Sequence, residues 1–308
     1  MTMSFRDASL VFLDHCRDTK TLSPHTLRAY EIDLAHAATQ IRAQKPITSI
    51  SRDDLRIYIS HMLRDEGLAE ATIKRRLATL KQLFKLLERE ELIEVNPFNR
   101  MDVSIRLPRR LPRALSKEDM RRLLSRSRWE MEQGGFSALT MHLAIVIMFV
   151  SGVRVSELTN LRIADLTVGE DGLLVHGKGN RERQVFLSGK EAKALLQVYL
   201  KRRSQYQPVT ENLLIGSDCE VWTPEILRRR LSSLAKRSNV SRRVTPHMIR
   251  HTAATQLIEA GVDIRFVQKL LGHASIATTQ IYTQVSDSSL RTALETANTL
   301  FRINYTDN

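Results

Sequence analysis

The sequence predicts a mainly α-helical fold with a small β element. Apolar residues recur at helical spacing through most of the chain, and one pair of short strand-like runs interrupts them. The length of 308 residues suggests two domains at about 150 residues per domain. We expect a helical N-terminal domain over residues 1–105, a linker over 106–114, and a mostly helical second domain with a short antiparallel sheet over 115–308.

The first domain carries recognisable helix starts. Ser23 followed by Pro24 is typical of a cap and a first helical position. Ser51 and Asp54 have the spacing of a variant capping box, which begins another helix. Gly67 is expected to end that helix, because glycine readily adopts the left-handed conformation found just after helices.

The next helix has one apolar face and one basic face. The steps of four and three residues between its apolar positions predict a buried stripe of Ile73, Leu77, Leu80, Phe84 and Leu87. The charged residues at its other positions are nearly all cations, and they include Arg75, Arg76 and Lys81. Two interpretations of these cations are open: they form a solvated face, or they contact phosphates. Because nearly all charges on this helix are positive, we favour phosphate contacts.

The segment 106–114 lacks helical periodicity. It is basic and contains two prolines, so we interpret it as an extended linker. Ser116 then begins a new helix. The runs 173–176 and 184–187, joined by the turn-forming and charged residues 177–183, predict a β-hairpin. Helices resume after it, and the apolar spacing after residue 282 predicts a further helix, whose simplest interpretation is packing on its own domain.

Composition restricts the partners. The formal net charge of +13 and the pI of about 10.1 favour a polyanion, because each Lys or Arg placed on a phosphate releases counterions. DNA, RNA and an anionic membrane surface all remain compatible with charge alone.

Cysteine usage and hydropathy indicate the cellular compartment in which the protein works. Cys16 and Cys219 stand far apart and outside any metal-binding pattern, so both are expected to be free thiols. The N-terminus lacks the apolar run of a signal peptide, and the longest apolar stretch, 143–150, is too short to span a bilayer. We therefore expect a cytoplasmic protein that does not bind membranes.

Three segments carry candidate chemistry, and the first contains Arg154. An apolar run ends at Gly152, so a buried helix should stop there and deliver Arg154 to a crowded position. Glu157 could fix its guanidinium by a charge-assisted hydrogen bond. Taken alone, a purely structural Arg–Glu pair is the simpler reading.

The second segment contains His247 and Arg250. Thr245 is a good N-cap and Pro246 suits the first helical position, so the two basic residues fall in the first turns of a helix. Free backbone N–H groups and the positive end of the helix dipole favour an anion at such a place. The spacing HxxR also occurs by chance, so it does not decide the function alone.

The third segment contains His273 and Tyr282. Gly272 permits a tight turn, and Ser275 could cap a short helix that projects Tyr282. A single histidine or tyrosine is more often structural than catalytic.

Together these segments resemble the tyrosine recombinases, also called the phage integrase family, and most closely its Xer branch. The segments GVRVSEL, HGKGNRERQVFL, TPHMIRHTAATQLIEAGVDIRFVQKLLGH and TTQIYT carry the resemblance, and LSPHTLRAYEIDL resembles the family's N-terminal domain. The likeness extends from about residue 5 to residue 290. It places the family's catalytic set, in order, at Arg154, Lys178, His247, Arg250, His273 and Tyr282.

The resemblance implies a role for each of these residues. Tyr282 would be the nucleophile, and His247 would assist its deprotonation. Arg154 and Arg250 would bind the scissile phosphate. Lys178 would protonate the departing 5′ oxygen, and His273 would donate a hydrogen bond to the phosphate.

The resemblance also implies the reaction and its partners. A site-specific recombinase would cleave and rejoin DNA through a 3′-phosphotyrosine intermediate, during integration, excision or resolution of DNA. It would need no cofactor, metal or ATP, since arginines neutralise the phosphate. Its partners would be double-stranded DNA with a specific recombination site and further recombinase protomers, in a homo- or hetero-oligomeric tetramer. The tail after residue 282 would then dock on a neighbouring protomer instead of on its own domain.

Two alternatives stay open. One is a DNA-binding accessory protein that has lost catalysis, and the other is an enzyme related to type IB topoisomerases. Ile249, Thr252, Ala253 and Gln284 depart from the usual Xer pattern, although none is a catalytic position. A recombinase of a mobile element is therefore as plausible as a chromosome-resolving enzyme.

Overall fold

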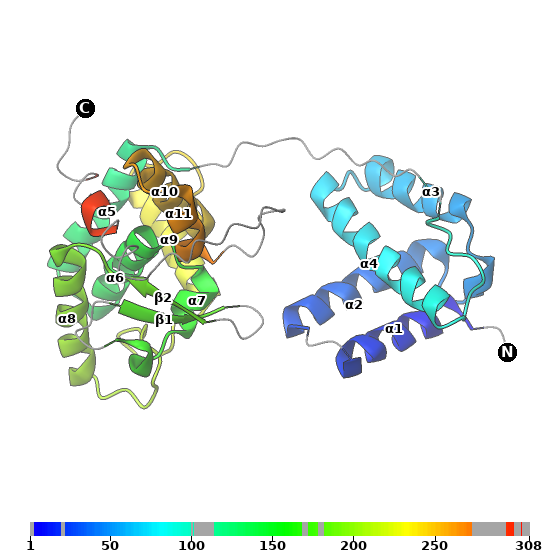
Figure 1. Cartoon of the computed structure of the whole chain (residues 1–308), viewed down its shortest axis with the longest axis horizontal. Coiled ribbons are helices and arrows are strands. Elements are labelled where there is room, and N and C mark those ends of the chain that lie inside the picture. The colour runs from blue at the N-terminus through cyan, green and yellow to red at the C-terminus, as the bar shows by residue number, and fades with distance from the viewer. Residues whose placement is uncertain are drawn as a thin grey trace. The chain divides into compact units, whose positions relative to one another are not determined.

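The computed structural model describes residues 3–19, 22–99, 101, 114–167, 172–177, 182–272, 294–298 and 303. The chain divides into two compact units, Met1–Arg109 and Arg110–Asn308 (Figure 1). Both units are mainly helical, and the second contains a two-stranded antiparallel sheet. The predicted fold class is confirmed.

The N-terminal unit packs its helices around one apolar core. Its helices are α1 (Phe5–Thr19), α2 (Pro24–Ile41), α3 (Arg52–Ser60) and α4 (Glu70–Arg89). A 3₁₀ turn (Ile47–Ser49) precedes α3, and a π-helical turn (His61–Asp65) extends it. Helices α1, α2 and α4 contact one another, and α3 packs on α2.

Local signals placed these helices correctly. The Ser23 hydroxyl accepts a hydrogen bond from the Thr26 N–H, and Ser51 and Asp54 form the reciprocal capping box. Gly67 has a φ of +58° and follows the π-helical turn. The predicted stripe of α4 is buried throughout, at Ile73, Leu77, Leu80, Phe84 and Leu87.

The C-terminal unit is built around a buried helix, α6 (Phe136–Ser151). It lies among α5 (Lys117–Glu132), α8 (Lys190–Gln205) and α10 (Pro246–Glu259) (Figure 1). The apolar run noted in the sequence is the central part of α6, which explains its lack of a polar face. Among the described residues, no helix is both long and apolar enough to cross a membrane.

The remaining elements surround the end of α6. They are α7 (Val155–Asn160), a 3₁₀ turn (Ile163–Asp165), β1 (Gly172–His176), β2 (Glu182–Phe186), α9 (Pro224–Arg237) and α11 (Ile264–Leu271). The hairpin pairs Gly172 with Phe186 and His176 with Glu182. It contacts α7 through β1 and α11 through β2.

The predicted hairpin is present, but β2 begins earlier than expected. Its first residues are Glu182 and Arg183, which looked like part of a charged turn. Both find partners inside the unit. Glu182 contacts His176 on β1, and Arg183 contacts Glu157 on α7. Pairing with Glu157 offsets the cost of burying the charge of Arg183, whereas Glu182 stays half exposed.

The described part of the C-terminal tail packs on its own unit. Residues 294–297 are helical, and Leu294, Ala297 and Ile303 are buried in the core of the C-terminal unit. Glu295 Oε1 lies 3.3 Å from Lys193 Nζ of α8, and Arg121 Nε of α5 donates to the Ile303 carbonyl.

Candidate active site

Arg154 occupies the junction between α6 and α7. Gly152 ends α6 with a φ of +63°, and a Cβ there would lie 2.5 Å from Leu271 Cδ2, so only glycine fits between α6 and α11 without a shift. Arg154 follows as the N-cap of α7 in an extended conformation. The sequence correctly anticipated that α6 would stop here and present this arginine.

Glu157 fixes Arg154 through two separate contacts. Its Oε2 accepts from the Arg154 backbone N–H at 2.8 Å, and its Oε1 accepts from Arg154 Nη1 at 2.8 Å. Burial of the carboxyl would raise the pKa of Glu157, but hydrogen bonds from Arg183 and Arg154 outweigh burial and lower the pKa to about 2. Glu157 is therefore ionised at neutral pH. The side chain of Arg154 remains 36% exposed.

Arg250 approaches the same place from α10. Thr245 caps the helix by accepting from the Met248 N–H, and Pro246 occupies its first turn, as predicted. Arg250 Nη1 donates to the Gly152 carbonyl and Nη2 donates to the Leu271 carbonyl, each at 2.6 Å. Arg250 thus ties the C-terminal ends of α6 and α11 together, where backbone carbonyls lack helical partners.

Burial makes the charge of Arg250 costly without removing it. Desolvation, reinforced by the positive charges of Arg154 and Arg183, lowers the pKa of Arg250 to about 10. The group remains protonated at neutral pH. His247 lies in the first turn of the same helix and is exposed to solvent.

A residue that sequence reasoning missed completes the cluster. Both Nη atoms of Arg183 donate to Glu157, at 3.0 and 2.7 Å, and its Nε donates to the Leu270 carbonyl at 2.9 Å. The arginine-rich run of the hairpin was visible in the sequence, but no local pattern indicated which member turns inward.

The cluster joins four parts of the chain. Arg154 and Arg183 bind the carboxylate of Glu157, and Arg250 binds the carbonyls of Gly152 and Leu271 beside them. Three guanidinium groups and one carboxylate leave a formal excess of two positive charges. Arg154 Nη2 also lies 3.3 Å from the Gly272 carbonyl, at the end of α11. Such a site favours an anion with more than one negative charge. Lys178, His273 and Tyr282 lie outside the described residues.

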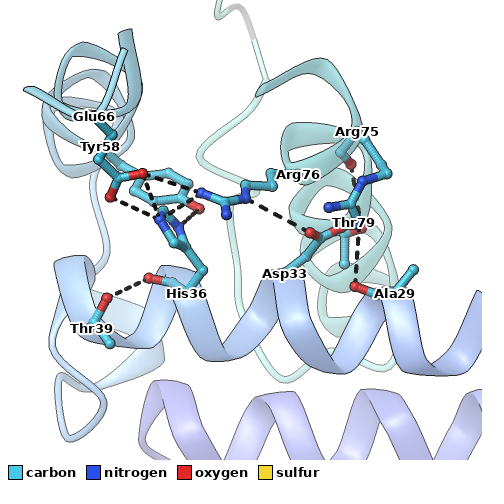
Figure 2. A network of polar contacts seen from close by, with 9 residues as sticks. All are labelled: Ala29, Asp33, His36, Thr39, Tyr58, Glu66, Arg75, Arg76 and Thr79. Carbon is cyan, nitrogen blue, oxygen red and sulfur yellow. Dashed lines mark hydrogen bonds and ion pairs between the residues drawn. The ribbon is translucent and has the colours of Figure 1, made fainter. Parts of the chain in front are cut away.

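Two of the basic residues predicted to contact DNA from α4, Arg75 and Arg76, bind partners within the N-terminal unit (Figure 2). Arg75 Nη1 lies 2.6 Å from Asp33 Oδ2 and keeps 45% of its side chain exposed. Arg76 is only 13% exposed and contacts His36 and Glu66. Lys81 is exposed, with its Nζ 5.7 Å from the centre of the Phe98 ring.

Asp33 is the anchor of this network. Its side chain is fully buried, accepts from Thr79 at 2.9 Å and from Arg75, and has Arg76 Nε at 3.9 Å. Asp33→Ala should destabilise the N-terminal unit by about 2–3 kcal/mol, because it removes a fully buried charged acceptor that Thr79 and Arg75 share. Hydrogen exchange of α2 and α4 measures this loss in the full chain.

A solvent-exposed ion pair in the same unit provides the matched control. Arg56 and Asp53 approach to 2.8 Å with both side chains largely exposed. Asp53→Ala should change stability by about 0–1 kcal/mol, as is usual for surface pairs. Equal losses for the two variants would show that burial gives Asp33 no special role.

Comparison with known proteins identifies the family. Residues 113–289 match the phage integrase family, and residues 11–91 match the phage integrase N-terminal SAM-like domain. The chain belongs to the phage integrase family. It is a tyrosine recombinase, a site-specific recombinase that cleaves and rejoins DNA strands by transesterification. The accessory-protein and topoisomerase alternatives gain no support from these matches.

Curated relatives match along most of the recombinase. It is 35% identical over 285 residues to the tyrosine recombinase XerD of Rhizobium meliloti (strain 1021), covering 91% of each chain. It is 32% identical over 286 residues to XerC of Listeria innocua serovar 6a, covering 91% of this chain and 93% of the relative. The expected likeness to the Xer branch is confirmed.

Solved structures share the fold. XerH site-specific recombinase bound to difH substrate, in a pre-cleavage complex, is similar with a TM-score of 0.67 and 24% identity, over 92% of this chain and 83% of that one. The Tn1549 transposon integrase in complex with circular intermediate DNA is similar with a TM-score of 0.69 and 22% identity. The match covers 95% of this chain and 99% of that one.

Proposed function

We propose that Tyr282 is the nucleophile of this recombinase and that Arg154 and Arg250 bind the scissile phosphate. The observation that carries the proposal is the gathering of three arginines at the joined ends of α6 and α11, where Arg154 and Arg183 bind Glu157. Arg250 binds the carbonyls of Gly152 and Leu271 at the same place. The excess of two positive charges matches the doubly negative phosphorane-like species formed when an oxygen attacks a phosphodiester. Pre-organised cations stabilise such a transition state more than its ground state.

The reaction balances without a cofactor. The Tyr282 oxygen forms a bond to phosphorus as the bond from phosphorus to the 5′ oxygen breaks. His247 accepts the tyrosine proton, since free tyrosine has a pKa of about 10 and attacks poorly at neutral pH. Lys178 donates a proton to the 5′ oxygen, and His273 donates a hydrogen bond to the phosphate. Attack by a 5′ hydroxyl of a second strand reverses these steps and rejoins DNA.

We also propose that the recombinase acts on double-stranded DNA with a specific recombination site, as an oligomer of up to four protomers. Solved structures of the same fold support this, because they include a lambda integrase dimer bound to a core site and a lambda integrase tetramer bound to a Holliday junction. The helical domain at 1–105 and the catalytic domain at 115–308, joined by the linker 106–114, would hold one half-site between them. The enzyme would work in the cytoplasm, where it reaches chromosomal DNA or a mobile element.

Trapping of a covalent intermediate tests this function. The full-length recombinase is incubated with a pool of duplexes of randomised sequence. Each duplex carries a nick, so that after cleavage the short fragment with the free 5′ hydroxyl diffuses away and the strand cannot be rejoined. We expect a protein–DNA adduct that survives denaturing electrophoresis and forms equally well in EDTA. Sequencing of the trapped DNA then gives the site. The absence of any adduct, or its loss in EDTA, would contradict the proposed chemistry.

The salt dependence of half-site binding tests the basic face of α4. Lys81 and Arg75 are exposed enough to reach a phosphate. Lys81→Ala should reduce the slope of log K against log[salt] by about 0.9, the value for one lost phosphate contact. Lys81→Arg keeps the charge and should leave the slope unchanged. If Lys81→Ala also leaves it unchanged, this face is only solvated.

A further inference from the structure

Arg183 is held on three sides by protein groups. Its side chain is 14% exposed, and Nε, Nη1 and Nη2 each donate to a protein oxygen. The two contacts to Glu157 are parallel, the bidentate geometry that fixes a guanidinium most firmly. Arg183 is therefore directed at the protein rather than at a substrate.

The contacts of Arg183 join separate parts of the active site. Glu157 is the carboxylate that holds the backbone and guanidinium of Arg154. The Leu270 carbonyl belongs to α11, whose next residue, Leu271, is bound by Arg250. A Cβ on Gly272 would lie 3.2 Å from Arg183 Cδ, Cζ and Nε, so the chain passes closely over this side chain.

Arg183 also lies next to the hairpin turn in sequence. It pairs with Val175 in the hairpin, while His176 and Glu182 form the pair before the turn. In the sequence, Lys178 lies between His176, the last residue of β1, and Glu182, the first residue of β2. A guanidinium bound to α7 and α11 therefore fixes the turn end of the hairpin relative to Arg154 and Arg250.

We propose that Arg183 is a positioning residue, which holds the hairpin so that Lys178 reaches the departing 5′ oxygen. This inference rests on the proposed function of Lys178 as the general acid. Misplacement of a reacting group by about 1 Å can cost up to about a hundredfold in rate. Loss of the bidentate contact between Arg183 and Glu157 should therefore slow DNA cleavage without weakening DNA binding.

The test compares two leaving groups in single-turnover cleavage. Arg183→Lys keeps the charge and much of the stem but loses the fork, and it should cleave an ordinary phosphodiester at least about tenfold more slowly than wild type. A 5′-bridging phosphorothiolate needs little protonation of its leaving group. With that substrate the rate of Arg183→Lys should return to within about threefold of wild type, as should that of Lys178→Ala.

A double-mutant cycle provides the second readout. If Arg183 acts through Lys178, the Lys178→Ala/Arg183→Lys variant should cleave the ordinary substrate no more slowly than Lys178→Ala alone. Half-site affinity should match wild type throughout. Arg183→Gln repeats the comparison with the charge removed.

Each contrary outcome has a distinct meaning. The positioning role of Arg183 would be overturned if its variants lost the same factor in cleavage rate on both substrates, whether or not misfolding caused the loss. It would also be overturned if the rate losses of the two single variants multiplied in the double variant. Failure of the phosphorothiolate to rescue Lys178→Ala would instead overturn the proposed role of Lys178 itself. Using one protein preparation for both substrates makes the rate ratio independent of the active fraction.

Discussion

Arg250→Ala is expected to slow DNA cleavage by at least about a hundredfold, the usual cost of removing one pre-organised transition-state donor. Arg250 is 7% exposed and holds the carbonyls of Gly152 and Leu271. Its removal takes away a positive charge from the proposed phosphate site and also removes the two hydrogen bonds that join the ends of α6 and α11. Single-turnover cleavage of a nicked substrate measures the chemical step directly.

A second buried arginine of the same unit separates chemistry from stability. Arg203 is 8% exposed and also donates to two backbone carbonyls, those of Thr210 and Asn212, at 2.6 and 2.7 Å. Arg203→Ala should therefore destabilise the unit in a similar way, because buried carbonyls lose their donor. Its cleavage rate per folded molecule should stay within about threefold of wild type, since removing this donor leaves the transition-state contacts in place. An equal loss of cleavage in both variants would show that Arg250 acts only on folding.

Tyr282→Phe should abolish cleavage altogether. The change removes one oxygen and little volume, so binding to a half-site should persist while no covalent adduct forms. Electrophoresis under denaturing conditions measures the adduct, and a mobility shift under native conditions measures binding.

Tyr206→Phe is the matched control for the loss of a tyrosine hydroxyl. The ring of Tyr206 stacks on Phe136 at 4.5 Å between centroids, and this contact survives the change. The Tyr206→Phe variant should form the adduct at the wild-type level. An adduct on the Tyr282→Phe variant would assign the nucleophile to another residue.

The helices of this recombinase were predictable because their signals are local. The caps at Ser23, Ser51 and Thr245 act within one turn, and the apolar stripe of α4 repeats within a single helix. Such signals depend on neighbouring residues only. The same holds for the end of α6, where glycine follows an apolar run.

Partners far apart in the sequence were not predictable in this way. Arg183 binds Glu157, which is 26 positions away in the sequence, and Arg75 binds Asp33, which is 42 positions away. A charged run on a helix or a hairpin looks the same whether its members face solvent, DNA or a buried carboxylate. Only the packing of the helices shows that Arg76 faces inward while Lys81 remains exposed.

The central claim is that Tyr282 carries the covalent bond to DNA. Trypsin cleavage after Lys269 and Arg291 releases a peptide, residues 270–291, in which Tyr282 is the only tyrosine out of the six in the chain. Mass spectrometry of the nuclease-trimmed adduct should find the remaining nucleotide on this peptide, linked through its 3′ phosphate to the Tyr282 oxygen. A nucleotide attached to any other residue, or linked through a 5′ phosphate, would contradict the account.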